Sequence, residues 1–395
     1  MQGRWPTIIF LWLVGVLAAA QLAKFSTIAP LLQDRFDLSL PATGLLISLL
    51  EVGGGLLGFV AGLALGWISC RRSLLTGVTI LAAASLLEAL APTRTMLFGA
   101  RAVEGIGYLL TVIAAPTTIA AIASDRDRAR ALALWSSFVP VGIAVGSGVT
   151  SLAVAPLGAQ GIIVLWAGLL AMTILPILRL DLSTDDNSRR RIVLPAPAAW
   201  LSTFAFGIYT LFLCALTMLL PTFLIAERAA ALDEAGLVAS LASLSALPAS
   251  GLAILLIRRG RLSTGRLLMI ATPSLVGTAL LVPLALNRSG DLPTTSVLIV
   301  GAVLLSGLVS PLMFARLPIL AGAESPHDPR IASANGLLTQ FGAGGALIGP
   351  PLGGLIADEW GWTALGGMIA GLALLMLTGV ALSEWIAAQS RPAGV

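Results

Sequence analysis

The sequence predicts an all-α integral membrane protein with twelve transmembrane helices in two pseudo-symmetric six-helix bundles. The first observation is composition: 57% of the 395 residues are hydrophobic and only 11% are charged, whereas a soluble protein carries about 25% charged residues. The second is a series of long apolar runs without alternation, which indicates helices because lipid requires backbone groups to be paired internally. The third is the distribution of basic residues between the two membrane sides.

Each apolar run is long enough to cross a bilayer, which takes about 20 residues. In chain order we expect spans at 7–31, 41–68, 73–92, 96–122, 130–155, 160–178, 197–225, 234–257, 264–286, 295–320, 331–356 and 362–386. The polar stretch 179–196 divides them six and six, so it predicts a cytoplasmic linker between an N-terminal bundle, 1–178, and a C-terminal bundle, 197–395. Internal repeats are common in secondary transporters, whose substrate site lies between the repeats.

Basic residues fix the orientation of these spans. Sixteen Arg residues fall on the side that holds the N-terminus and four fall on the other side, so both termini are expected in the cytoplasm. The start also reads as a signal peptide cleaved near Ala18–Ala20, but its removal would break this alternation. Arg greatly outnumbers Lys, and the residues Ala, Gly and Leu are abundant. From this composition we expect a bacterial source and the cytoplasmic (inner) membrane.

Two glycine ladders predict helix faces that approach other helices closely. They comprise Gly54, Gly58, Gly62 and Gly66 in the second span and Gly345, Gly349 and Gly353 in the eleventh. Small residues at every fourth position let helix backbones pack tightly in lipid. Tight packing inside one bundle and a moving interface between bundles are both compatible with this spacing.

Several motifs together resemble the major facilitator superfamily over essentially the whole chain. The fourth span, "LFGARAVEGIGYLLTVIAAP", is similar to the family's Arg-x-x-x-Gly-x-Gly motif at Arg101, Gly105 and Gly107, with Glu104 where Gln is usual. The stretches "SDRDRARALALWSS" and "SANGLLTQFGAGGALIGPPLGGLIADEWGW" are similar to other family segments. The resemblance implies that spans two and eleven, and spans five and eight, pack against each other across the two bundles. Both glycine ladders would then meet at one interface.

The chain also departs from the family pattern. The loop between spans two and three reads "GLALGWISCRR", so that Arg71 and Arg72 alone remain as candidates for the family's charged gate there. The fifth span lacks the Gly-Pro signature of drug antiporters. Lys24, in "KFSTIAPLLQDRF", resembles the basic residue in the first span of the cyanate and nitroimidazole branch.

Charges inside the spans are the candidates for function, because each costs at least about 2.5 kcal/mol to insert. Six residues qualify by position: Lys24, Glu51, Glu88, Arg101, Glu104 and Arg316. Glu88, four residues before Pro92, is expected at the membrane interface. For each of the others a structural role, such as snorkelling to the membrane surface or local pairing, stays open beside the functional one.

The functional interpretation gives these charges two roles. Lys24, Gln21, Tyr209 and Arg316 are expected to bind substrate in a central cavity. Glu51, Arg101 and Glu104 are expected to couple transport to protons, and Arg101 and Glu104 share one helix face because they are three residues apart. The charge set is balanced to slightly positive, which favours a small organic anion. A proton-coupled multidrug efflux antiporter for lipophilic or cationic compounds is the alternative.

The overall prediction is a secondary active transporter that works by alternating access. We expect a monomer whose partners are a small-molecule substrate, protons and the lipid bilayer. Sequence leaves the substrate, the direction and the choice between protons and sodium open. No His-Glu-x-x-His pair or Gly-x-Ser-x-Gly elbow occurs, so an enzyme, a metal site and a cofactor are not expected. The basic residues are not interleaved with aromatics, so no nucleic acid is expected. Cys70 and Cys214 predict no disulfide.

Overall fold

The computed structural model describes residues 4–64, 69–180, 193–258, 262–325 and 328–389. Every regular element in these ranges is helical, as expected for a chain that must satisfy its backbone groups in lipid. Two of the sequence predictions fall on residues that are not described: Gly66 and most of the linker 179–196. Gly62 is part of a helix, but its surroundings are not among the described contacts.

The N-terminal half contains the first six spans, several of them broken into two helices. These elements are α1 (Arg4–Thr27), α2 (Ala29–Phe36), α3 (Leu40–Ser48), the 3-10 turn η1 (Leu49–Glu51), α4 (Val52–Ala64), α5 (Cys70–Ala89), α6 (Arg94–Ile122), α7 (Asp125–Trp135) and α8 (Phe138–Arg179). Within this half, α1 packs on α8, and α5 packs on α6 and α8.

The C-terminal half contains the last six spans. Its elements are α9 (Pro197–Arg228), α10 (Leu232–Leu244), α11 (Ala246–Arg258), α12 (Thr264–Ala285), α13 (Leu292–Gly307), α14 (Val309–Leu320), α15 (Pro329–Trp360) and α16 (Trp362–Gln389). Here α9 packs on α15 and α16, and α12 packs on α13 and α16.

The span count agrees with twelve crossings. Ten segments among the described residues are long and apolar enough to cross a membrane. One of them, Arg130–Arg179, has 50 residues and contains Gly158 in a non-helical conformation (φ 65°, ψ 174°), so it makes two crossings. The glycine-rich α15 has 32 residues, which is about 48 Å of helix and supplies a twelfth crossing.

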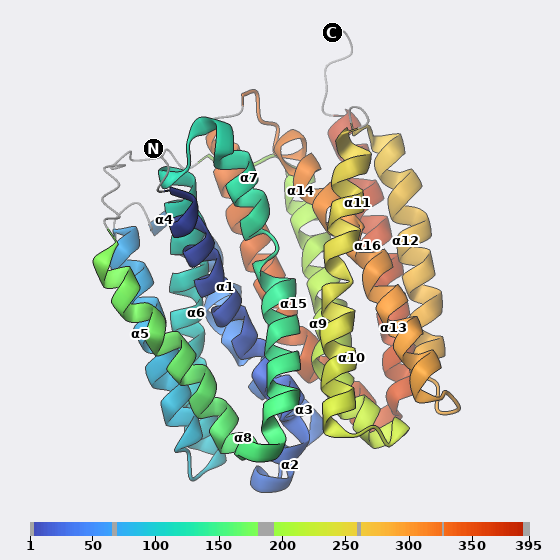
Figure 1. Cartoon of the computed structure of the whole chain (residues 1–395). Coiled ribbons are helices and arrows are strands. Elements are labelled where there is room, and N and C mark those ends of the chain that lie inside the picture. The colour runs from blue at the N-terminus through green and yellow to red at the C-terminus, as the bar shows by residue number, and fades with distance from the viewer. Residues whose placement is uncertain (1–3, 65–68, 181–192, 259–261, 326–327, 390–395) are drawn as a thin grey trace.

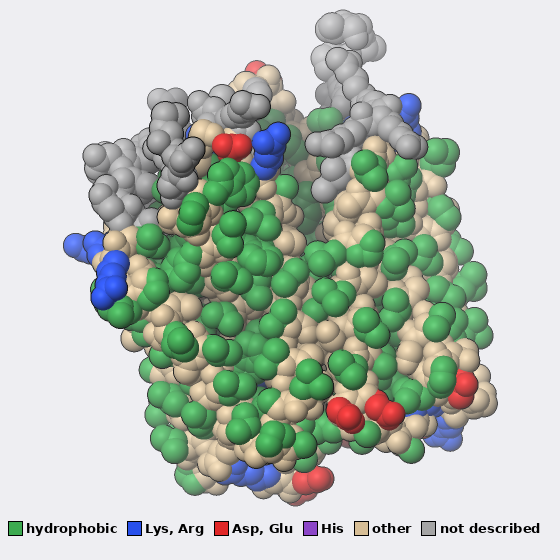
Figure 2. Space-filling view, in the orientation of Figure 1, with side chains coloured by type: hydrophobic (Ala, Val, Ile, Leu, Met, Phe, Trp, Pro, Cys, Tyr) green, Lys and Arg blue, Asp and Glu red, His purple; other side chains and the backbone are tan. Residues whose placement is uncertain are grey.

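The helices stand side by side, with α1 beginning and α16 ending at the same edge of the molecule (Figure 1). We call this the terminal edge, and the opposite edge, where α2 lies, the far edge. Figure 2 shows a belt of hydrophobic side chains across the middle of the visible face, with charged side chains towards the two edges. The same view shows the surface hollowed at the terminal edge.

The two halves meet through the helices that the family resemblance implies. Span two, as α3 and α4, packs on α15, and α8 packs on α10. Towards the far edge the seam is joined by hydrogen bonds: the Ser26 hydroxyl donates to the Met218 carbonyl (2.6 Å), and the Ser240 hydroxyl donates to the Ala144 carbonyl (2.9 Å). Towards the terminal edge α4 and α15 remain in contact, where the Phe59 N–H donates to Gln340 Oε1 (3.2 Å), whereas α11 packs on α13 and α14 of its own half.

The first glycine ladder lies on the seam between the halves. A Cβ added at Gly54 would lie 2.7 Å from the Ala343 Cβ, and one at Gly58 would lie 3.1 Å from the Gln340 Cα. These glycines therefore allow α4 and α15 to approach closely, as small residues do in membrane helices.

The second ladder does not lie on that seam, and the prediction that both ladders meet was wrong. A Cβ at Gly345 or Gly349 would overlap the backbone of α9 at Gly207 or Leu211. One at Gly353 would contact Ala215 of the same helix (3.1 Å). The helix α15 is rich in small residues on two faces, and the ladder is the face that packs inside the C-terminal half.

Candidate functional site

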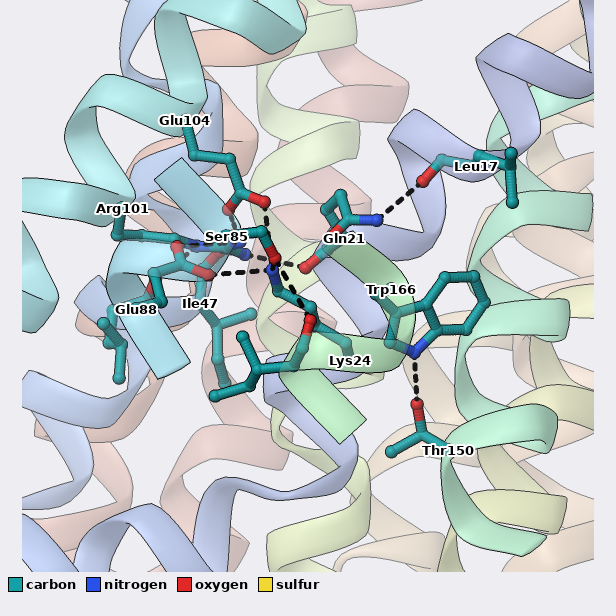
Figure 3. A network of polar contacts seen from close by, with 12 residues as sticks. Leu17, Gln21, Lys24, Ile47, Ser85, Glu88, Arg101, Glu104, Thr150 and Trp166 are labelled. Atoms are coloured by element: carbon teal, nitrogen blue, oxygen red, sulfur yellow. Dashed lines mark hydrogen bonds and ion pairs between the residues drawn. The ribbon is translucent and has the colours of Figure 1, made fainter. Parts of the chain in front are cut away.

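Four charged side chains converge inside the N-terminal half (Figure 3). They are Lys24 of α1, Glu88 of α5, and Arg101 and Glu104 of α6, and all four are fully buried as side chains. Ser85 of α5 joins them. We call these five residues the N-terminal cluster.

The contacts in the N-terminal cluster leave both cations paired. The Lys24 Nζ lies 2.8 Å from Glu88 Oε2, 2.9 Å from Glu104 Oε1 and 2.7 Å from the Ser85 hydroxyl. The second oxygen of Glu104 accepts a hydrogen bond from Arg101. Two cations face two carboxyl groups, so the formal charges of the cluster balance, as a buried group of charges requires.

Arg101 uses its remaining donors on backbone. Its Nε donates to the Leu46 carbonyl (3.1 Å), and a terminal nitrogen donates to the carbonyls of Ile47 (3.0 Å) and Gln21 (2.9 Å). Leu46 and Ile47 lie in the last turn of α3, and the last four carbonyls of a helix have no intrahelical partner. Arg101 therefore stabilises the point where the second span stops being a regular helix.

The two glycines after Arg101 let α6 pack against this break and against α5. A Cβ at Gly105 would lie 2.9 Å from the carbonyl oxygens of Leu49 and Leu50 in η1. A Cβ at Gly107 would lie 2.7 Å from the Gly77 carbonyl oxygen of α5. The Arg-x-x-x-Gly-x-Gly motif is thus the surface of α6 that holds the broken second span.

Glu51 is the last residue of η1 and differs from the N-terminal cluster in two ways. It is partly exposed, and no ion pair between described residues includes it. Its carboxylate interacts with the Tyr108 hydroxyl of α6 and lies near Cys214 of α9. A Cβ at Gly54 would be 3.6 Å from its Oε2. We call Glu51, Tyr108 and Cys214 the Glu51 site, which joins residues of both halves.

Arg316 does not join these residues, contrary to the prediction of a shared central cavity. It is buried in α14 and forms an ion pair with Glu384 of α16. It also donates to the Leu262 carbonyl (2.9 Å) and to Thr264 Oγ1 (3.3 Å), at the start of α12. We call Arg316, Glu384 and Thr264 the C-terminal cluster. Its place beside the end of α16 puts it near the terminal edge.

The other predicted substrate residues are buried in their own halves. Gln21 is fully buried, and its side-chain nitrogen donates to the Leu17 carbonyl (2.9 Å), whereas its side-chain oxygen has no partner. Tyr209 lies between Phe206 and Phe212, with ring centroids 5.7 and 5.5 Å away. Tyr209 lies near Cys214 of the Glu51 site, but neither side chain supplies a charge there.

The predicted gate residues Arg71 and Arg72 lie at the beginning of α5, where both are exposed. Arg71 donates to the Leu178 carbonyl at the end of α8, which belongs to the same half. No ion pair between described residues joins either arginine to the C-terminal half. Among the described residues no group of His, Cys, Asp and Glu is arranged to hold a metal ion.

Sequence reasoning missed the partners Glu88 and Glu384. Glu88 was expected at the membrane interface because it lies near the end of its span, but it is 2% exposed and points into the bundle. The available signal was charge balance: Lys24, Arg101 and Arg316 outnumber Glu51 and Glu104, so further carboxylates were needed to pair them.

Together these contacts determine which charges are available to a solute. Lys24, Arg101 and Arg316 are each engaged by a carboxylate, so they neutralise charges of the protein itself. Glu51 remains as a carboxylate without an ion pair among the described residues, at the seam of the two halves and beside an aromatic hydroxyl. Such a site suits a proton or a cation, because either would compensate its negative charge.

Comparisons with known proteins agree with this architecture. A model of the Major Facilitator Superfamily matches residues 11–321. A bacterial homologue of the human lysosomal transporter Spinster, in an inward-facing and occupied conformation, aligns with a TM-score of 0.74 and 15% identity over 99% of this chain and 98% of its own. The nucleoside transporter NupG aligns with a TM-score of 0.73 and 14% identity over 95% of this chain and 99% of its own. At these identities the likeness shows the fold alone.

One curated relative is similar in sequence over a shorter region. The lincomycin resistance protein of Streptomyces lincolnensis is 33% identical over 120 residues, which are 30% of this chain. The match spans 25% of the length of that relative.

Proposed function

The chain belongs to the major facilitator superfamily, and we propose that this secondary transporter exports an organic cation in exchange for protons that bind at Glu51. It is a multi-pass membrane protein and not an enzyme. The observation that carries the proposal is the charge balance inside the spans. Among the described carboxylates inside the spans, Glu51 has no ion pair. The three cations inside the spans are each paired with another carboxylate.

A carboxylate at membrane depth can be compensated by a proton or by a cation. If both compete for Glu51, binding of one releases the other, and the two fluxes are coupled in opposite directions. The Tyr108 hydroxyl and the seam position of Glu51 support this role, because a group between the halves is exposed to one side at a time when the halves rock. The positive-inside pattern of the basic residues supports a cytoplasmic position for the terminal edge.

The partial likeness to a lincomycin resistance protein supports export as the direction of transport. Resistance is consistent with removal of a compound from the cell, so the likeness favours export. An organic anion, the substrate that charge counting favoured, has weaker support because its expected partners Lys24, Arg101 and Arg316 hold carboxylates of the protein. Arg101 and Glu104 accordingly support Glu51 in this proposal and do not carry the proton.

The coupling role of Glu51 is tested by Glu51→Gln in proteoliposomes. We expect accumulation driven by a pH gradient to be lost, whereas exchange between two substrate pools persists when substrate is raised to compensate for weaker binding. The reason is that Gln keeps the shape of Glu but binds neither a proton nor a cation by charge. Glu51→Asp, which keeps the carboxylate, is the matched control. Accumulation that survives Glu51→Gln would contradict the proposal.

The substrate class is identified by thermal unfolding in detergent with a panel of lipophilic cations, neutral solutes and small acids at two pH values. A ligand at a hundredfold excess over Kd adds about 2.7 kcal/mol to the free energy of unfolding. We expect cations to stabilise the protein, more at the higher pH, and this effect to disappear in Glu51→Gln. Stabilisation by acids that depends on Lys24 would instead support the anion.

A further inference from the structure

Glu88 is a buried carboxyl group that pairs with Lys24 and is not part of the Glu51 site, and we propose that it is a positioning residue for Glu51. It acts through Lys24, Glu104 and Arg101 on the break in the second span that carries Glu51. This inference rests on the proposed function of Glu51 in proton coupling. The Arg-x-x-x-Gly-x-Gly motif does not include Glu88, which lies on a different helix.

A continuous series of contacts connects Glu88 to the second span. Glu88 Oε2 pairs with Lys24 Nζ (2.8 Å), and Lys24 Nζ pairs with Glu104 Oε1 (2.9 Å). The other oxygen of Glu104 pairs with Arg101. Figure 3 shows these side chains converging from α1, α5 and α6.

The last contacts reach the segment that carries Glu51. Arg101 donates to the carbonyls of Leu46 and Ile47, and Glu51 lies four residues after Ile47 at the end of a 3-10 turn. A regular helix would rotate the residues after this point by a different amount, because 3-10 and α-helices differ in their residues per turn. The direction of the Glu51 side chain therefore depends on where the guanidinium of Arg101 is held.

Glu88 is required because Glu104 faces two cations. With Glu88 present, Lys24 has a carboxylate largely to itself. The Lys24 Nζ is 2.8 Å from Glu88 Oε2, whereas the Arg101 nitrogen is 3.9 Å from Glu88 Oε1. Without the Glu88 charge, Lys24 and Arg101 compete for Glu104 alone, and the buried cluster carries an uncompensated positive charge. A buried charge without a partner is strongly unfavourable, so we expect the side chains and Arg101 to rearrange.

The C-terminal cluster provides a matched control. Glu384 is also a buried carboxylate paired with an arginine, at 1% exposure, but its partners lie on α12 and α14. Removing its charge therefore causes the same kind of defect in the half that does not hold the break in the second span.

The experiment compares Glu88→Gln, Glu384→Gln, Glu51→Gln and the double variant Lys24→Met/Glu88→Gln in proteoliposomes. The readout is the ratio of pH-driven accumulation to exchange, per molecule of folded protein. We expect Glu88→Gln to lower this ratio by about tenfold, within the range of coupling changes reported for residues remote from a ligand. The neutral double variant should recover the ratio to within about threefold, because it removes the unpaired charge together with its partner.

The outcomes separate this inference from the proposed function. If Glu51→Gln leaves the ratio unchanged, the proposed function fails. If Glu51→Gln lowers the ratio but Glu88→Gln leaves it as in the parent protein, or if Glu384→Gln lowers it as much, positioning by Glu88 is wrong. A double variant as defective as Glu88→Gln would also overturn it, since Glu88 would then act by its own carboxylate. Should Glu88→Gln fold poorly, the double variant and Glu88→Asp are each compared with the parent protein by the same readout, the ratio of pH-driven accumulation to exchange.

Discussion

The two halves of the molecule each bury one cluster of charges, and the clusters differ in what their arginines hold. In the N-terminal half, Arg101 donates to the carbonyls at the end of α3, where the second span breaks. In the C-terminal half, Arg316 donates to Leu262 and Thr264, where α12 begins. Both arginines also pair with a buried glutamate.

From this difference we infer that similar chemistry serves two purposes in the two bundles. The N-terminal cluster lies next to the segment that carries Glu51, so a change in its charge reaches the seam between the halves. The C-terminal cluster joins α12, α14 and α16 near the terminal edge, within one half. We therefore regard the first as coupled to transport and the second as a brace.

The largest effects are expected from removing the two arginines. Arg101→Leu and Arg316→Leu each leave a buried glutamate without its arginine, and breaking a buried pair in this way costs about 3–5 kcal/mol. Both variants should therefore unfold at lower temperature in detergent. Per folded molecule, however, Arg101→Leu should lose pH-driven transport and Arg316→Leu should keep it.

The comparison fails if Arg316→Leu also abolishes transport per folded molecule, because both clusters would then serve transport.

Arg101→Lys is an informative additional variant. Lysine keeps the charge for Glu104 but lacks the planar fork that reaches two carbonyls and a carboxylate at once. We expect it to recover part of the stability and little of the coupling.

The sequence predicted the fold well because lipid leaves few alternatives. Apolar runs of the right length must be helices, and the basic residues assigned the loops, so twelve crossings and two bundles followed. The pairing of charges could not be predicted in the same way. Glu88 pairs with Lys24 because of the rotation and depth of α5, and neither quantity is visible in an apolar run that is hydrophobic on all sides.

The glycine ladders illustrate the same limit. Spacing by four shows that a helix has a face for close packing, but not which neighbour that face meets. In α4 the face with Gly54 and Gly58 meets the other half, whereas in α15 the face with Gly345 meets α9. Since α15 packs against both halves, its small residues serve two interfaces, and only the three-dimensional arrangement assigns them.

These two ladders give the second prediction, which is of intermediate size. Gly345→Ala should destabilise the protein by about 1–3 kcal/mol, because its Cβ would overlap the backbone of α9 within one half. Gly58→Ala should be milder, since its Cβ would lie 3.1 Å from the nearest atom of Gln340. Gly58→Leu should lower transport by wedging the halves apart, with little loss of helix content.

Thermal unfolding and transport measured on the same preparations separate these effects. Gly99→Ala is a matched control, because a Cβ there would have nothing within 4 Å. If Gly345→Ala lost transport while keeping normal stability, the second ladder would belong to a moving interface, and its assignment to packing within one half would be wrong.

The smallest expected effect is at the start of α15, the helix that touches both halves. Asp328 precedes it and accepts hydrogen bonds from the backbone N–H groups of Arg330 (2.9 Å) and Glu324 (3.1 Å). These bonds hold the pKa of Asp328 below its ordinary value of 3.8. Because the folded-state pKa is the lower one, the stabilisation is complete above the ordinary pKa and is lost as the pH falls through the folded-state pKa.

We therefore expect Asp328→Ala to lower the unfolding temperature slightly at neutral pH, and the difference from the parent protein to narrow in acid. Asp328→Asn keeps a side chain that caps a helix without a charge, so its difference from Asp328→Ala should not change with pH. Unfolding followed by fluorescence from neutral pH to below the ordinary pKa measures both. A difference that widens in acid would mean that the Asp328 charge opposes the packing of α15, so that its bonds to the backbone do not determine its effect.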